Sequence, residues 1–254
     1  MIHLNVYIIE KLKINSNTLV REYKYFPENK KELRSLLEKR IHDNPDANLN
    51  DIDVSKIDDM FSLFYDLDPH NIDISEWDVS NVKNMANMFI YCSSFNCDLS
   101  GWNVSNVENM DSMFYECNNF NSDLSKWNVS KVTKLDSTFW ECGKFDSDLS
   151  KWNVSNCKNM SCVFYGCKRF NSDLSKWDVS NVESMSGMFR CCTKFSSDLS
   201  KWDVSKVKDM YAMFAETHSF NSDLSNWNIE SVNNMKFMFR DCTSMKNIPS
   251  WYKE

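Results

Sequence analysis

The sequence predicts an α/β solenoid, and three observations lead to that prediction. Tryptophan recurs at a constant spacing of 25 residues, phenylalanine forms a second column at the same spacing, and each unit combines two hydrophobic periodicities. The tryptophan column consists of Trp77, Trp102, Trp127, Trp152, Trp177, Trp202 and Trp227. One unit cannot bury its own apolar side, whereas stacked units can, so a repeat this regular indicates a solenoid.

The first part of each unit, with the pattern Leu-x-x-Trp-x-Val, predicts a half-buried β-strand. In the unit "LSKWNVS" the Trp and Val side chains alternate with polar ones, which is typical of a strand with one buried face. Stacked units would pair these strands in parallel about 4.8 Å apart. We therefore expect a parallel β-sheet along one face of the solenoid.

The second part of each unit predicts a short helical segment on the other face. Within Val104–Cys117 the apolar side chains recur at three- and four-residue steps, which places them on one side of a helix. These residues are Val107, Met110, Met113, Phe114 and Cys117. Ser105 occupies the position expected of a helix N-cap.

The chain divides into a cap and a repeat region. About eight 25-residue repeats begin at residue 49, and Ile248 and Trp251 start a closing strand, so residues 49–254 form the predicted solenoid. Residues 1–48 lie outside the repeat and predict a β-hairpin turning at Asn15–Thr18, followed by a helix over about 27–42. Solenoid ends need a cover, so we expect residues 1–48 to be an N-terminal cap. A small enzymatic or toxin activity there is the alternative.

The repeat also resembles a known family. Residues 170–189, "FNSDLSKWDVSNVESMSGMF", match the hallmark pattern of the leucine-rich-repeat family of bacterial surface proteins of the BspA-like and Mycoplasma-lipoprotein type. The resemblance covers most of the chain. It implies a leucine-rich-repeat solenoid with a binding role, often adhesion at a cell surface, and it implies no catalytic residue.

Composition restricts the partners and the location. A net charge of −7 argues against a nucleic-acid binder, which needs many cationic side chains. No apolar run is long enough to span a membrane, and the N-terminus lacks a basic region before its apolar run, so we expect no membrane insertion and a cytoplasmic location. A cell-surface or secreted protein, exported by an unrecognised route, is the alternative. We expect a monomer.

The polar face of the predicted sheet is the first candidate binding surface. One lysine per unit forms a lysine column made of Lys126, Lys151, Lys176 and Lys201. Asn128 and Asn153 belong to the next polar column. Leucine-rich repeats commonly bind partners on this face. The alternative is that regular charges merely keep the sheet soluble and discourage edge pairing.

The residue after each column phenylalanine varies, and this position is the second candidate surface. It holds Tyr115, Trp140 and Tyr165 in three consecutive units and Arg190 in the fourth. Aromatic side chains and arginine are typical anchors of protein interfaces. Partial burial against the neighbouring unit is the alternative.

The other recurring residues favour structural roles. An aspartate column, formed by Asp98, Asp123, Asp148, Asp173, Asp198 and Asp223, recurs too often for a catalytic acid and predicts bonds to turn amides. The tryptophan column predicts a buried stack, with an exposed glycan-binding ladder as the alternative. The ten cysteines predict buried reduced thiols, with disulfides or a metal site as the alternatives.

We therefore expect no catalytic residue, no cofactor and no metal. The sequence favours a non-catalytic protein–protein interaction module with a protein partner. A surface adhesin that binds a host protein or glycan is the first alternative.

Overall fold

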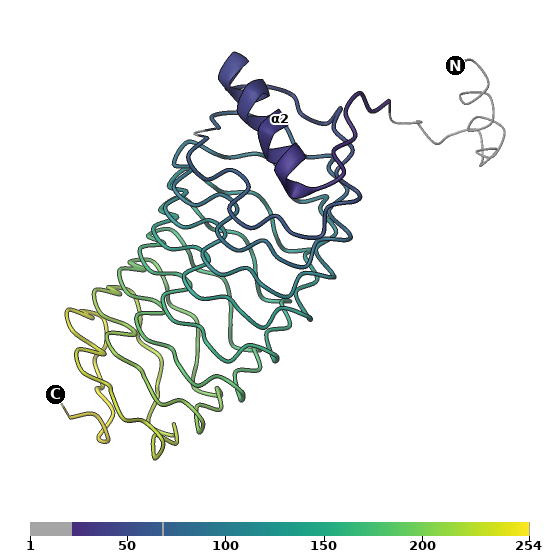
Figure 1. Ribbon diagram of the computed structural model, residues 1–254. Coiled ribbons are helices and arrows are strands. Elements are labelled where there is room, and N and C mark those ends of the chain that lie inside the picture. The colour runs from purple at the N-terminus through teal and green to yellow at the C-terminus, as the bar shows by residue number, and fades with distance from the viewer. Residues whose placement is uncertain (1–21, 68, 254) are drawn as a thin grey trace, which may run out of the picture.

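The repeat region winds into coils that stack one above another. The computed structural model describes residues 22–67 and 69–253, and Figure 1 shows successive turns of the chain lying side by side, with helix α2 across one end and the C-terminus at the other. Backbone pairing links residues 25 positions apart in parallel, as in Asn84 with Asn109 and Asn109 with Lys134. The sequence period is therefore the length of one coil.

Each coil is a chain of β-turns. In the coil that begins at Leu124, the Trp127 N–H donates to the Leu124 carbonyl at 3.0 Å, and the Val132 N–H donates to the Val129 carbonyl at 2.9 Å. The same bond across three residues recurs in most coils at three further columns of residues spaced 25 apart. The accepting carbonyls belong to the column Met (Met110 and its equivalents), the column Phe (Phe114 and its equivalents) and the column Cys (Cys117 and its equivalents). Turns of this kind bring the residues at their two ends toward one side, and these are the apolar residues of the repeat.

The structure has neither the predicted helical segments nor the predicted sheet in the part of the repeat that it describes. Over Val104–Cys117 the backbone N–H groups of Met110, Ser112, Phe114 and Glu116 donate to the next coil, at 2.7 to 3.0 Å. An α-helix would direct those groups to carbonyls within the same segment. Ser112 and Glu116 also have positive φ, 53° and 58°, which a right-handed helix excludes.

Parallel pairing also lies elsewhere than predicted. Among the described residues it consists of single-residue bridges rather than strands, and in most coils the bridge immediately precedes the column Met instead of lying at Leu-x-x-Trp-x-Val. The bridged pairs are Tyr25–Ile52, Asn48–Asp73, Asp59–Asn84, Asn84–Asn109, Asn109–Lys134, Lys134–Asn159, Asn159–Ser184, Ser184–Asp209 and Asp209–Asn234. In the Leu-x-x-Trp-x-Val segment the backbone hydrogen bonds form turns within the coil. Side-chain hydrogen bonds connect this segment to the neighbouring coils.

The core runs the length of the stack as columns of identical side chains. The tryptophan column is buried, each ring from Trp77 to Trp227 being 4% exposed, so the predicted buried stack is confirmed and the exposed glycan ladder is wrong. The Trp127 and Trp152 rings are parallel within 3° at 6.5 Å. Each column indole N–H donates to a leucine or isoleucine carbonyl of the preceding coil, for example Trp127 Nε1 to Leu99 O at 3.0 Å and Trp102 Nε1 to Ile74 O at 3.0 Å. Each buried indole therefore has both packing for its ring and a hydrogen-bond acceptor for its N–H.

Helix α2, Lys30–Asp43, covers the first coil. Asn29 caps it by accepting the Glu32 N–H at 3.0 Å, and Leu33, Leu37 and Ile41 face the core. The helix predicted over 27–42 is thus present, whereas most of the predicted hairpin falls on residues 1–21, outside the described residues. α2 is too short and too polar to cross a membrane, and no other described helix could do so.

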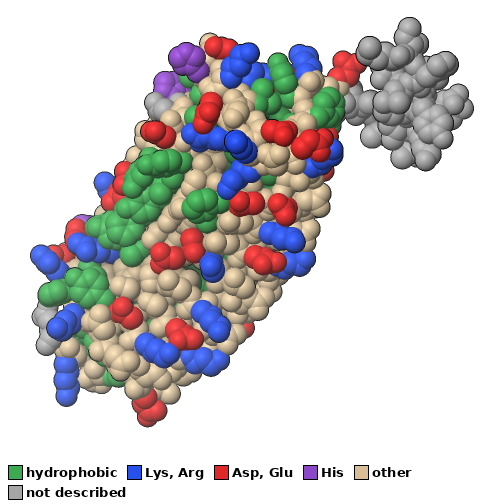
Figure 2. All heavy atoms as spheres, viewed as in Figure 1, with side chains coloured by type: hydrophobic (Ala, Val, Ile, Leu, Met, Phe, Trp, Pro, Cys, Tyr) green, Lys and Arg blue, Asp and Glu red, His purple; other side chains and the backbone are tan. Residues whose placement is uncertain are grey.

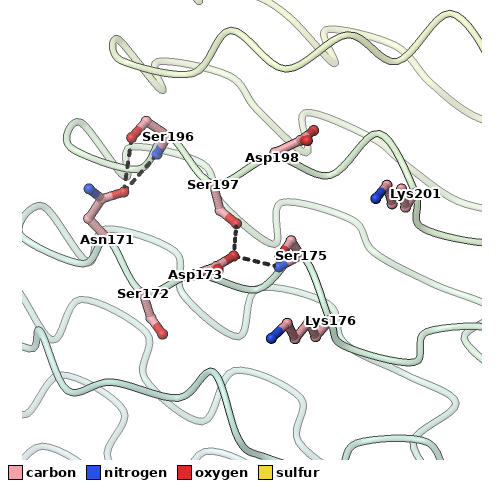
Figure 3. A pocket seen from close by; sticks show the side chains of 9 residues that line it. All are labelled: Asn171, Ser172, Asp173, Ser175, Lys176, Ser196, Ser197, Asp198 and Lys201. Atoms are coloured by element: carbon pink, nitrogen blue, oxygen red, sulfur yellow. Dashed lines mark hydrogen bonds between the residues drawn. The ribbon is translucent and has the colours of Figure 1, made fainter.

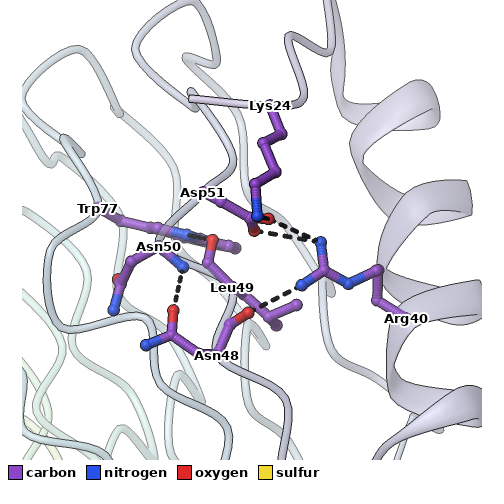
Figure 4. Close-up of polar contacts among 7 residues, drawn as sticks. All are labelled: Lys24, Arg40, Asn48, Leu49, Asn50, Asp51 and Trp77. Atoms are coloured by element: carbon purple, nitrogen blue, oxygen red, sulfur yellow. Dashed lines mark hydrogen bonds and ion pairs between the residues drawn. The ribbon is translucent and has the colours of Figure 1, made fainter. Parts of the chain in front are cut away.

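Side-chain contacts fasten the N-terminal segment to this first coil. Arg40 donates to Asp51 Oδ1 at 3.1 Å and to the Asn48 carbonyl at 2.8 Å, and the Lys24 ammonium lies 3.7 Å from Asp51 Oδ2 (Figure 4). The Tyr25 carbonyl also accepts the Asp53 N–H at 2.9 Å. The described part of residues 1–48 is therefore engaged with the stack.

Candidate functional site

The lysine column lies on the surface, beside shallow polar hollows. All four lysines are exposed, and none of them has an ion pair among the described residues. A hollow of about 510 Å³ is lined by Lys176 and Lys201 together with Asp173 and Asp198 (Figure 3). A similar hollow of about 480 Å³ repeats one coil earlier, beside Lys151.

The carboxylates of these hollows are already used by the fold. Asp173 Oδ1 accepts the Ser175 N–H at 2.9 Å and the Ser197 hydroxyl at 3.4 Å, while the Ser197 oxygen accepts the Leu174 N–H at 2.9 Å (Figure 3). The N–H of Ser175 holds the pKa of the Asp173 carboxyl below its usual value. The same bonds recur along the aspartate column, so the predicted bonding to turn amides is confirmed.

The amide column on the other side of the lysines is also engaged in turns. Asn128 and Asn153 are exposed, and their side-chain oxygens accept the N–H of Ser130 at 3.1 Å and of Ser155 at 3.2 Å. Each lysine thus stands between two columns whose oxygens stabilise the backbone. Because carboxylates surround the lysines, the surface offers no concentrated positive charge for a polyanion.

The variable position forms a continuous surface stack. The Tyr115 and Trp140 rings are 5.4 Å apart and nearly parallel, and the Trp140 and Tyr165 rings are 3.9 Å apart with 4° between their planes. The Arg190 guanidinium lies 5.4 Å from the Tyr165 ring centre, at a cation–π distance. The structure therefore brings together the three aromatic residues that the sequence singled out and adds the arginine that follows them.

Two further tyrosines extend this stack: Tyr65, which follows a column phenylalanine as Tyr115 does but is not among the residues that the sequence nominated, and Tyr91, which sequence reasoning missed. Tyr91 lies 5.6 Å from Tyr115 and 6.3 Å from Tyr65 by ring centres. Tyr91 stands one residue beyond the column, where Ile90 occupies the column position, so column reading alone could not place it. We call the combined set the aromatic ladder; it comprises Tyr65, Tyr91, Tyr115, Trp140, Tyr165 and Arg190.

The aromatic ladder is partly exposed along its whole length. Tyr65 and Tyr91 are 47% and 52% exposed, and the other members are half-buried. Figure 2 shows hydrophobic side chains gathered in a strip along one edge of the stack. From Tyr115 to Arg190 each ring covers the face of the next, so the expected partial burial against the neighbouring unit is confirmed. That this strip binds a partner stays a prediction.

Charged side chains lie at the Arg190 end of the aromatic ladder. Arg190 Nη2 lies 3.4 Å from Glu216 Oε1. Gly166 makes room for the Glu141 carboxylate, because a Cβ atom at that glycine would lie 2.5 Å from the carboxyl carbon. Burial raises the pKa of the Glu141 carboxyl and of the Tyr165 hydroxyl. The ladder is therefore an apolar strip with one cation and two acids at one end.

The two candidate surfaces remain separate. No ring contact, ion pair or hydrogen bond among the described residues joins a ladder member to the lysine column. Of the residues that the sequence nominated, Tyr115, Trp140 and Tyr165 act as one group, whereas the lysine column, Asn128 and Asn153 are spread regularly along a solvated face.

The described residues also show little for redox or metal chemistry. Within the described ranges no group of three or more His, Cys, Asp or Glu side chains could hold a metal ion. The cysteines are free thiols, and Cys117 Sγ donates to the Phe89 carbonyl at 3.0 Å in the core. Burial raises the pKa of the Cys117 thiol well above its usual value, which makes it a poor nucleophile.

Comparison with known proteins places the chain in a family. No protein with a curated description matches it. A family model matches it twice in tandem, over residues 31–152 and 134–252, as expected of a repeat. Because these matches cover most of its length, the chain belongs to the family described as "Mycoplasma protein of unknown function, DUF285".

Proposed function

We propose that the chain is a non-catalytic protein–protein interaction module built on a leucine-rich-repeat-type solenoid of the BspA-like kind. The aromatic ladder is the observation that carries this proposal. A tryptophan, four tyrosines and an arginine form one contiguous strip across successive coils, and these are the residue types that dominate binding energy at protein interfaces.

A binding role also fits the chemistry of the rest of the surface. The repeated carboxylates and amides are committed to turns and to contacts between coils, and α2 is fastened to the first coil by Lys30, Arg34 and Arg40. These contacts support a capping role for residues 1–48 rather than a separate enzyme or toxin. The proposed partner is a protein and not a nucleic acid, because the net charge is −7.

A ladder variant tests the proposal. Tyr91→Ala, Trp140→Ala and Tyr165→Ala combined should abolish capture of the partner from a lysate of the native host. Lys151→Ala, Lys176→Ala and Lys201→Ala combined form the matched control, because they remove the same number of side chains from the other candidate surface. Both proteins must keep the thermal unfolding midpoint of the parent within a few degrees.

The outcomes are distinct. Loss of capture with the ladder variant alone supports the aromatic ladder as the binding surface. Loss with the lysine variant alone would transfer the function to the polar face, and unchanged capture with both would contradict the proposal. Fractionation of the native host for the protein separates an internal module from the alternative of an exported adhesin.

A further inference from the structure

From the column Met to two residues beyond the column Phe, the backbone hydrogen bonds between coils point the same way along the stack. Just before the column Met they run in the opposite direction, as from the Glu108 N–H to the Lys83 carbonyl at 2.8 Å. In the segment that contains the column Met and Phe, every second N–H donates to the following coil. One chain of such bonds begins where the Ser62 N–H donates to the Ala86 carbonyl at 3.0 Å, and in the next coil the Asn87 N–H donates to the Asp111 carbonyl at 2.9 Å. The chain ends where the Ala212 N–H donates to the Lys236 carbonyl at 2.9 Å. The N–H groups of the column Met and column Phe residues donate to the following coil in the same direction. At one end of the stack this segment therefore has carbonyl groups without an N–H from another coil. At the other end it has N–H groups without a carbonyl from another coil.

The carbonyl end is sealed by cations of α2. Phe61 and Leu63 occupy the positions whose carbonyls, in later coils, accept an N–H from the coil before. Here Lys30 Nζ donates to the Phe61 carbonyl at 3.3 Å, and Arg34 Nη1 donates to the Leu63 carbonyl at 2.8 Å. Aligned peptide groups leave a partial negative charge at their carbonyl ends, so cationic side chains are the expected complement there.

The opposite end has no such cover among the described residues. The N–H groups of Met235, Phe237, Phe239 and Asp241 are the equivalents of donors that bond to the next coil in most other coils, and no described group accepts them. Figure 1 shows α2 across one end of the stack only. These four N–H groups are called the donor edge.

The side chains around the donor edge form an apolar plate. Phe237 is 41% exposed, and Met235 and Val232 are half-buried, whereas their equivalents one coil earlier, Ala212, Met210 and Val207, are buried. Trp251 covers part of this end by stacking on Trp227 at 6.5 Å, and Trp251 and Tyr252 pack against the Phe239 ring at 6.4 and 5.1 Å. These contacts bury the Phe239 side chain but supply, among the described residues, no acceptor to the N–H groups of the donor edge. The apolar plate thus exposes the side chains that an inner coil would expose if the following coil were removed.

We propose that the donor edge and its apolar plate bind an extended polypeptide segment of another protein, which adds the missing half coil. The segment must present carbonyl oxygens at every second residue and apolar side chains toward the plate. It should also be acidic, because the aligned N–H groups carry partial positive charge and the two exposed cations Lys236 and Arg240 outnumber the one described acid beside them, Asp241, which lies 3.5 Å from Arg240. A hollow of about 510 Å³ lined by Phe239, Arg240, Asp241, Ile248 and Tyr252 adjoins the site.

The polarity argues against a second copy as the occupant. Two donor edges facing each other would place N–H groups against N–H groups. Stacking the donor edge on the first coil of another copy would require its carbonyls, which Lys30 and Arg34 already occupy beneath α2. A separate segment with free carbonyls satisfies the edge, and neither end of a folded copy does.

A peptide with the sequence of residues 104–117, with Ser in place of Cys117, is the direct probe. In the chain this segment covers the equivalent edge, supplying the Asn109, Asp111 and Met113 carbonyls to the coil before it. It carries three acidic residues and no basic one. A labelled copy of this peptide should bind the full chain saturably by fluorescence anisotropy, and a scrambled peptide of the same composition should not.

Amide hydrogen exchange followed by NMR locates the contact. The Met235, Phe237, Phe239 and Asp241 amides should exchange rapidly in the free protein and slow by about tenfold or more when the peptide is bound. The equivalent amides of inner coils serve as internal controls, because they are bonded in both states. Protection of the donor edge in the free protein, or binding without its protection, would overturn the proposal.

Charge reversal supplies the matched variants. Lys236→Glu with Arg240→Glu should weaken peptide binding by about tenfold at low salt, whereas Lys176→Glu with Lys201→Glu on the polar face should leave it unchanged. Equal loss in both variants would reduce the effect to net charge and refute a defined site. The ladder variant that tests the proposed function should bind the peptide normally, so the two proposals can fail independently.

Discussion

Replacement of one buried indole tests the role of the tryptophan column. Trp152 is 4% exposed, packs 6.5 Å from the Trp127 ring and 6.1 Å from the Phe139 ring, and donates its indole N–H to the Leu124 carbonyl at 3.0 Å. Trp152→Ala should lower the free energy of unfolding by about 3–5 kcal/mol, as large-to-small substitutions in cores do. Part of that loss comes from the Leu124 carbonyl, which would stay buried without its donor.

A second substitution separates packing from hydrogen bonding. Trp152→Phe keeps an aromatic ring in the column but removes the indole N–H, so it should cost about 1–3 kcal/mol, the usual penalty of a buried unsatisfied acceptor. Trp251→Ala is the matched control, because Trp251 makes the same bond to Leu224 and the same stack on Trp227 but is only half-buried at the end of the stack. Its loss should be smaller than that of Trp152→Ala.

Equilibrium urea unfolding, followed by both tryptophan fluorescence and circular dichroism, measures these differences. Coincident transitions by the two probes would show that the stack unfolds as one unit, which allows the free energies to be compared directly. A loss below about 1 kcal/mol for Trp152→Ala would place it with surface substitutions and refute the inference that the column holds adjacent coils together.

Three further changes probe other parts of the fold. Arg34→Ala should destabilise the protein by about 1–2 kcal/mol and speed exchange of first-coil amides, because it exposes the Leu63 carbonyl; unchanged exchange would contradict a sealing role. Gly166→Ala should destabilise by about 1–3 kcal/mol, since its φ is 71° and the new Cβ would meet the Glu141 carboxyl, and Glu141→Ala should recover part of that loss in a double-mutant cycle; full additivity would contradict the clash. The aspartate column has pKa values lowered by serine N–H groups, so its stabilisation should be present above about pH 4 and lost as pH falls through the lower folded-state pKa values; acid unfolding of Asp173→Asn at the same pH as the parent would contradict this.

The sequence predicts the buried columns well because identical side chains 25 residues apart can only stack on one another. It misleads about the backbone because the spacing of Met110, Met113, Phe114 and Cys117 suits both a helix and a chain of β-turns, each of which places residues three apart on one side. A discriminating signal is present in the position before the second Met of each unit. That position has positive φ in the structure; it holds Phe237 in the eighth unit and small residues or Asn in the seven before it: Ser62, Asn87, Ser112, Ser137, Cys162, Gly187 and Ala212.

The sequence likewise predicts some residues of the candidate site and misses others. Column reading finds Tyr115, Trp140 and Tyr165 because they share one register, and their contact follows from stacking. Tyr91 escapes it, because its ring reaches the same strip from the next position along the chain, where φ is 64°. Side-chain direction at such a turn depends on backbone geometry that the repeat pattern does not encode.

The polarity of the stack explains why residues outside the repeat matter as much as the repeat. Over the segment from the column Met to two residues beyond the column Phe, every inner coil donates N–H groups to the following coil and accepts them from the preceding one. Any number of identical coils is therefore equally satisfied, and the repeat itself sets no end. An end is set only where a different chemistry meets the unpaired groups. At the first coil that chemistry is the ammonium of Lys30 and the guanidinium of Arg34, carried by a helix that also buries Leu33 and Leu37. At the donor edge the complement must be an acceptor, and this requirement limits its occupant more strictly than the apolar plate does.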